Sequence, residues 1–93
     1  MKKPSISFRH FGGSGPLSIY WYPGPYGDAV ETKDGSGVGW FAPNGELLGV
    51  EFDDVAFAHD HQVLVFADGE HVEVRVARGK VSVQVRPPRR KVA

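Results

Sequence analysis

The sequence predicts an all-β fold, a single small antiparallel meander of about seven strands that forms either a barrel or two packed sheets. Three observations favour this fold. The chain has 93 residues, which suits one domain with a modest core. Apolar and polar residues alternate over most of it, which is the period of half-buried strands. Short segments rich in glycine, proline, asparagine and aspartate interrupt this alternation and predict tight turns.

Residues 5–11 and 29–33 are expected to form short strands. In the first, Ile6 and Phe8 alternate with serine and arginine until the glycine-rich residues 12–16 end the strand. The second follows a loop rich in proline and glycine. The N-terminal residues lack the apolar core of a signal peptide and the sequence has no membrane span, so we expect a cytoplasmic protein without membrane association.

The strand expected at residues 17–22 has aromatic side chains on both faces. Leu17, Ile19 and Trp21 share one face, and Ser18, Tyr20 and Tyr22 share the other. With Tyr26 in the following loop, the tyrosines could form an aromatic binding surface, although aromatic residues of strands more often pack against their neighbours.

A hairpin is expected at residues 37–54. Pro43 presets φ for the first corner of the turn, and Gly45 can take the left-handed conformation that closes a three-residue loop. This loop would place Ala42 opposite Glu46, Trp40 opposite Leu48, and Val38 opposite Val50. The large apolar side chains of the hairpin would then share one face.

One segment of the chain, well under half of its length, resembles the small bacterial family described as domain of unknown function 2283. The resemblance covers residues 17–53 and rests on Leu17-Ser18-Ile19-Tyr20, on Asp28-Ala29-Val30-Glu31-Thr32, and on the hairpin from Gly37-Val38-Gly39-Trp40 to Gly49-Val50-Glu51-Phe52. It implies a compact β fold without an assigned activity. Genes of this kind resemble companions of small toxin-like ribonucleases, which by analogy implies an antitoxin-like role.

Residues 53–60 have no clean period, and we expect them to cross the sheet irregularly with Val55 and Phe57 buried. Strands are expected next at residues 62–67, 71–77 and 80–86. Two-residue loops of the kind found in type I′ hairpins would join them.

The loops of these last hairpins, Asp68-Gly69 and Arg78-Gly79, predict the register of the strands. The expected pairs are Val65 with Val72, Val63 with Val74, Val76 with Val81, Val74 with Val83, and Val72 with Val85. Every valine would then lie on one face. Leu64 and Phe66 would lie on the other face, among polar residues.

The sequence therefore predicts a noncatalytic protein-interaction module, either antitoxin-like or self-associating. Leu64 and Phe66 would be the apolar residues of an otherwise polar face, with His71 beside them, so we expect these three residues to bind a protein partner or a second copy.

Nucleic-acid binding is the first alternative, because charge is segregated along the chain. All eleven acidic residues lie between residues 28 and 73, whereas the chain beyond residue 73 carries only cations. The basic candidates are Arg75, Arg86, Arg89, Arg90 and Lys91. Residues 1–86 would form the single domain and residues 87–93 a basic, proline-rich tail.

A metal-dependent enzyme is the second alternative. His59 and His61 would share a face of an extended segment, with Asp53 as a third ligand. Asp54, His10 and His71 are other possible third ligands. The chain has no cysteine, which excludes a disulfide framework, a thiolate nucleophile and a cysteine zinc site. Otherwise we expect neither catalysis nor a cofactor.

Overall fold

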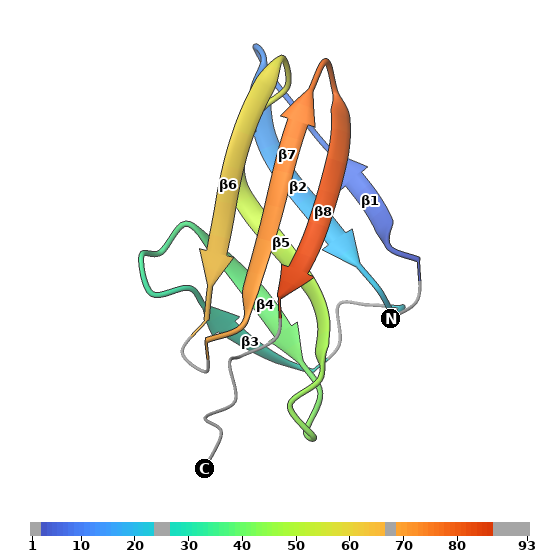
Figure 1. Cartoon of the computed structure of the whole chain (residues 1–93), viewed down its shortest axis with the longest axis vertical. Helices are drawn as coiled ribbons and strands as arrows, with labels where there is room; N and C mark the ends of the chain where they lie inside the picture. The colour runs from blue at the N-terminus through green and yellow to red at the C-terminus, as the bar shows by residue number, and fades with distance from the viewer. Residues whose placement is uncertain (1–2, 24–26, 67–68, 87–93) are drawn as a thin grey trace.

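Eight strands form two antiparallel sheets. A computed structural model of the protein describes residues 3–23, 27–66 and 69–86. Its strands are β1 (Ser5–Phe8), β2 (Ser14–Tyr20), β3 (Asp28–Glu31), β4 (Gly37–Phe41), β5 (Leu47–Ala56), β6 (His59–Val65), β7 (His71–Ala77) and β8 (Lys80–Arg86). The order is β1-β2-β5-β4-β3 in one sheet and β6-β7-β8 in the other, and Figure 1 shows the smaller sheet in front of the larger. The all-β prediction is confirmed, in its form of two packed sheets.

The strand order differs from a simple meander at β2. This strand pairs with β5, placing Leu17 opposite Phe52 and Ile19 opposite Val50, while β3 lies at the far edge of the sheet beyond β4. Strands β2 to β5 therefore form a Greek-key arrangement. The alternation predicted for β2 is confirmed, because Leu17, Ile19 and Trp21 are buried.

Strand β5 replaces the irregular crossing predicted for residues 53–60, and that prediction is wrong. The strand continues to Ala56, and β6 begins at His59. Between the pairs Leu17–Phe52 and Gly15–Val55, β5 has one more residue than β2, so it is bulged near Asp53. This bulge keeps Val55 fully buried, whereas Phe57 in the turn is 36% exposed.

The central hairpin has the predicted loop but a different register. The Ala42 N–H donates to the Glu46 carbonyl over 2.8 Å, and Gly45 is left-handed with a φ of 88°. A bulge then intervenes, because Phe41 pairs with Leu47 but Trp40 pairs with Gly49. The expected pairs Trp40–Leu48 and Val38–Val50 are therefore wrong by one residue.

The last hairpin, β7-β8, has the predicted register. Val76 pairs with Val81, Val74 with Val83, and Val72 with Val85. The two-residue loop supplies the two positive φ angles that a type I′ turn needs, 51° at Arg78 and 77° at Gly79.

The β6-β7 hairpin does not have the predicted register. The Phe66 N–H donates to the Glu70 carbonyl over 3.0 Å, so three residues separate the paired ends instead of two. Leu64 consequently pairs with Val72, and the side chains of β6 are turned over relative to the prediction. Leu64 and Phe66 are 0% and 1% exposed, whereas Val63 is 38% exposed. Leu64 and Phe66 are thus core residues, which removes the exposed contact predicted from them.

Two glycines of β4 receive these side chains between the sheets. A Cβ atom at Gly37 would lie 2.9 Å from Leu64 Cδ2, and one at Gly39 would lie 2.6 Å from Phe66 Cζ. The Phe66 ring also meets Phe41 edge to face, with ring centroids 5.2 Å apart. The buried core comprises Leu17, Ile19, Trp21, Leu47, Val50, Phe52, Val55, Leu64, Phe66, Val72, Val74 and Val76.

The residues that the structure describes contain no helix long and apolar enough to cross a membrane. Strand β8 ends at Arg86. The predicted tail, residues 87–93, lies outside the described residues.

Substitution of neighbouring residues in β6 tests its register. Leu64→Ala should lower the free energy of unfolding by about 2–5 kcal/mol, because it removes a fully buried side chain. Val63→Ala should cost about 1 kcal/mol or less, because Val63 faces solvent. Urea unfolding followed by circular dichroism measures both values. A larger loss for Val63→Ala would restore the register in which the valines are buried.

Candidate functional site

Each sheet turns one face to the core and one to solvent. The register defines two outer faces, because directly paired residues point to the same side of a sheet. Face A, on the five-stranded sheet, comprises Ser5, Ser7, Ser18, Tyr20, Ala29, Glu31, Val38, Trp40, Gly49 and Glu51. Face B, on the three-stranded sheet, comprises His59, His61, Val63, Val65, His71, Glu73, Arg75, Ala77, Lys80, Ser82, Gln84 and Arg86.

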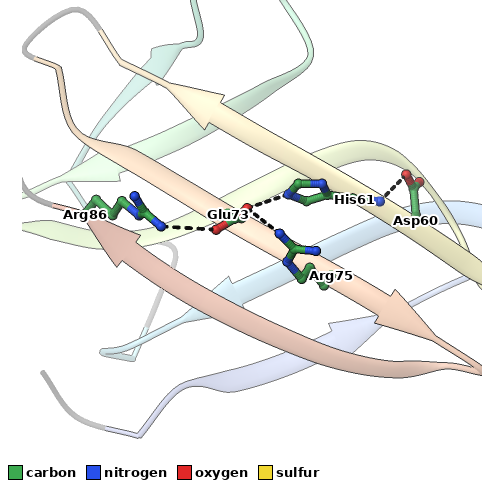
Figure 2. A network of polar contacts seen from close by, with 5 residues as sticks. All are labelled: Asp60, His61, Glu73, Arg75 and Arg86. Atoms are coloured by element: carbon green, nitrogen blue, oxygen red, sulfur yellow. Dashed lines mark hydrogen bonds and ion pairs between the residues drawn. The ribbon is translucent and has the colours of Figure 1, made fainter.

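Glu73 is the centre of a polar cluster on face B (Figure 2). His61 Nε2–H donates to the Glu73 carboxylate over 2.5 Å, and Arg75 and Arg86 approach its two oxygens at 3.4 and 3.9 Å. The His61 hydrogen bond lowers the pKa of Glu73; burial opposes this effect, and the charges of Arg75 and Arg86 reinforce it. Glu73 is therefore an ionised carboxylate that holds three side chains from three strands together.

The basic residues predicted to bind nucleic acid are only partly described. Arg75 and Arg86 lie on face B with side chains 67% and 65% exposed, but both are drawn toward Glu73. Arg89, Arg90 and Lys91 lie outside the described residues. His71, predicted to contact a partner, is half-buried on the same face. Nucleic-acid binding through these residues stays a prediction.

Asp60 joins the two sheets at the corner between β5 and β6. Its carboxylate accepts hydrogen bonds from the Ala56 N–H at 2.8 Å, from Gln62 Nε2 at 3.0 Å and from the His61 N–H at 2.7 Å. Gln62 Nε2 also donates to the Asp54 carbonyl over 2.7 Å. Partial burial raises the pKa of Asp60, but these hydrogen bonds to the charged form outweigh it and lower the pKa overall. Asp60 thus satisfies backbone groups where β5 leaves its sheet.

The histidine and aspartate residues of this region do not form the predicted metal site. His61 is directed at Glu73, and Asp53 belongs to β5 of the other sheet. Among residues 3–23, 27–66 and 69–86, no three histidine, aspartate or glutamate side chains are arranged to hold a metal ion. His59 and His61 share face B as predicted, but no third ligand joins them within the described part of the chain.

An aromatic pair lies at the middle of face A. Tyr20 and Trp40 both pair with Gly49, one from each neighbouring strand, and their ring centroids are 5.8 Å apart. A Cβ atom at Gly49 would lie 2.2 Å from the Tyr20 ring. Glycine is therefore required at this position, because the Tyr20 ring lies directly over the backbone.

A carboxylate lies on the next row of face A. Ser18 Oγ donates to Glu51 Oε1 over 3.0 Å, and Glu51 pairs with Ser18 on one side and Val38 on the other. Burial, followed by the negative charge of Glu51, raises the pKa of Tyr20. The aromatic pair therefore lies close to an acidic side chain on the same face.

Two shallow hollows flank Tyr20. One, of about 400 Å³, is lined by Lys3, Ser5 and Tyr22, among others, and the second, of about 330 Å³, by residues that include Arg9 and Glu51. At the end of β2, the Tyr22 hydroxyl donates to Glu46 over 2.6 Å, which raises the pKa of Tyr22. Face A therefore combines aromatic rings, hydroxyl groups and a carboxylate.

The sequence predicted part of this surface. It placed Tyr20 and Tyr22 on one face. Tyr20 lies on the solvent side of β2, whereas Tyr22 lies beyond the end of this strand and packs partly buried against the core, and Tyr26 lies outside the described residues. It did not predict Trp40 beside Tyr20. The available signal was the doublet Leu47-Leu48, which breaks the alternation expected of a strand and marks the bulge that sets Trp40 opposite Gly49.

Comparisons with protein-family models, with curated proteins and with solved structures found no match to this chain. The two faces are therefore the basis for assigning a function.

Asp60→Asn tests whether the charge of the Asp60 carboxylate stabilises the fold, because this contribution should depend on pH. The lowered pKa means that Asp60 stabilises the fold above the ordinary aspartate pKa, and that this stabilisation is lost as pH falls through the folded-state pKa. At neutral pH the free energy of unfolding of the variant should be about 1–3 kcal/mol lower than that of the native protein, because an amide cannot accept all three hydrogen bonds. Below about pH 4 the difference from the native protein should shrink.

Chemical unfolding of both proteins across this pH range measures the difference, with exposed Asp53→Asn as the control. A difference in unfolding free energy that stays constant with pH would show that the charge of Asp60 has no part in the stabilisation.

Proposed function

We propose that this chain is a noncatalytic protein-interaction module and that face A binds the partner, which is another protein or a second copy. The observation that carries the proposal is the Tyr20–Trp40 pair, which lies on the solvent side of the sheet over Gly49. Tyrosine and tryptophan are enriched at the centres of protein interfaces, where they supply large contact areas at low cost in side-chain entropy.

The surroundings of the pair suit such a contact. Ser5, Ser7 and Ser18 lie on the same face, and Glu51 adds a carboxylate on the neighbouring row. A polar rim of this kind surrounds the apolar centre of a typical interface. Both rings are half-buried in the free chain, so a partner that covers them would remove the remaining apolar area from water.

The titratable groups with shifted pKa values support a binding role over a catalytic one. The pKa is raised for Tyr20 and Tyr22, which keeps the phenols protonated. Hydrogen bonds, those from Ser36 first, lower the pKa of Asp34, and the pKa values of Asp60 and Glu73 are also lowered, which keeps these carboxylates ionised. Each of these shifts moves a pKa away from neutral pH, where general acid–base groups work best.

We also propose that the chain belongs to the family described as domain of unknown function 2283. The residues that carry this resemblance, 17–53, contain Tyr20, Trp40 and Gly49. A location in the bacterial cytoplasm and an antitoxin-like role belong to the same proposal.

Photo-crosslinking tests the contact face. A benzophenone amino acid at position 40 should give a discrete protein adduct in cells that produce the protein, because Trp40 is at the proposed contact. The control position is Phe11, another aromatic residue, which is 80% exposed but lies outside face A. Tyr20→Ser should remove most of the adduct at position 40. Equal adducts from positions 40 and 11, or none from either, would contradict the proposal.

A further inference from the structure

We infer that face A binds an arginine side chain of the partner, with the guanidinium group stacked on the Tyr20–Trp40 pair and hydrogen-bonded to Glu51. This inference rests on the proposed function, because it assigns the chemistry of the partner at the same contact face.

The arrangement of face A in rows supports this assignment. Tyr20, Gly49 and Trp40 are directly paired and form one row across three strands. Glu51 is two residues from Gly49 on the same strand and points to the same side, about 7 Å further along. An aromatic surface and a carboxylate at this spacing can both contact one planar cation.

Glu51 is available to such a cation. Its carboxylate accepts a hydrogen bond from Ser18, which fixes its position without neutralising its charge. Arg9 lines the hollow beside it. Among the residues that the structure describes, however, the ion pairs are those of Glu73, and none includes Glu51. A half-buried carboxylate without an ionic partner favours a cation from outside the chain.

The charge of the neighbouring strands favours a positive occupant as well. Glu31 faces outward from the edge strand β3 and pairs with Val38. Glu31 and Glu51 are the charged residues of face A as defined by the described pairs, whereas Lys3 and Arg9 line only the hollows on the β1 side. A cation over Trp40 therefore approaches two carboxylates, and it is attracted by the faces of both rings.

The geometry selects arginine over lysine. A guanidinium group is planar, so it can stack on an aromatic ring while its edge donates two hydrogen bonds to a carboxylate. An ammonium group is a compact and strongly hydrated charge that cannot do both. The partner is thus a protein segment that presents an arginine to the exposed sheet.

Nuclear magnetic resonance titration tests this inference with a defined probe, the capped peptide acetyl-Gly-Arg-Gly-amide. The two tryptophan indole N–H signals serve as reporters, because Trp40 is at the site and Trp21 is buried with 4% exposure. The arginine peptide should shift the Trp40 indole and Gly49 amide signals saturably and leave Trp21 in place. Peptides with lysine or with neutral citrulline instead of arginine should bind about fivefold more weakly or worse.

Two matched variants complete the test. Glu51→Gln keeps an acceptor for Ser18 but removes the charge, and it should weaken binding of the arginine peptide about fivefold or more. Glu73→Gln removes a carboxylate from face B and should change nothing. Equal binding of the citrulline or lysine peptide, no effect of Glu51→Gln, or no shift of Trp40 would each overturn the inference.

The two proposals fail separately. Absence of the photo-crosslink would contradict the proposal that face A is the contact face. A crosslinked partner together with no response to the arginine peptide would contradict only the assignment of a guanidinium group to that face.

Discussion

The absence of side chains at Gly37 and Gly39 lets the two sheets approach each other. Leu64 and Phe66 enter the space where Cβ atoms of these residues would stand, at separations of 2.9 and 2.6 Å. Packing of this kind is intolerant of shifts, because real Cβ atoms would collide at such distances. The contact fixes which side of β6 faces the core. Through the pairing of β6 with β7 it also fixes which residues form face B.

Single-residue shifts of register decide the chemistry of both faces. The bulge near Leu48 sets Trp40 opposite Gly49, beside Tyr20, instead of opposite a leucine. The three-residue connection between Phe66 and Glu70 turns Leu64 inward and Val63 outward. Because strand side chains alternate with a period of two, each shift exchanges the exposed and buried sets of a whole strand. The proposed contact and the core are thus products of the same two irregularities.

The sequence predicted the fold class and those turns whose residues specify one geometry. Arg78-Gly79 and Pro43-Asn44-Gly45 gave the right loops, because glycine at a positive φ leaves few alternatives. Asp68-Gly69 fits a two-residue or a three-residue loop equally well. The alternation could not choose between them, since Val63 and Val65 are as apolar as Leu64 and Phe66. The deciding contacts, with the glycines of β4, join segments far apart in the chain and leave no local signal.

The candidate site was predictable to a similar extent. The tyrosine-bearing face of β2 followed from simple alternation, but its partner Trp40 depends on a bulge in another strand. The cluster at Glu73 brings together His61, Arg75 and Arg86 from three strands. Their mutual positions follow only from the corrected β6-β7 register.

The most direct measurement of the central claim is a nuclear Overhauser effect between the Phe66 ring protons and the α-protons of Gly39. The structure predicts a strong effect, because the ring occupies the space over that glycine. A Phe66 ring that shows no effect to Gly39 and lies on the solvent side of β6 would contradict the packing of the two sheets and, with it, both faces.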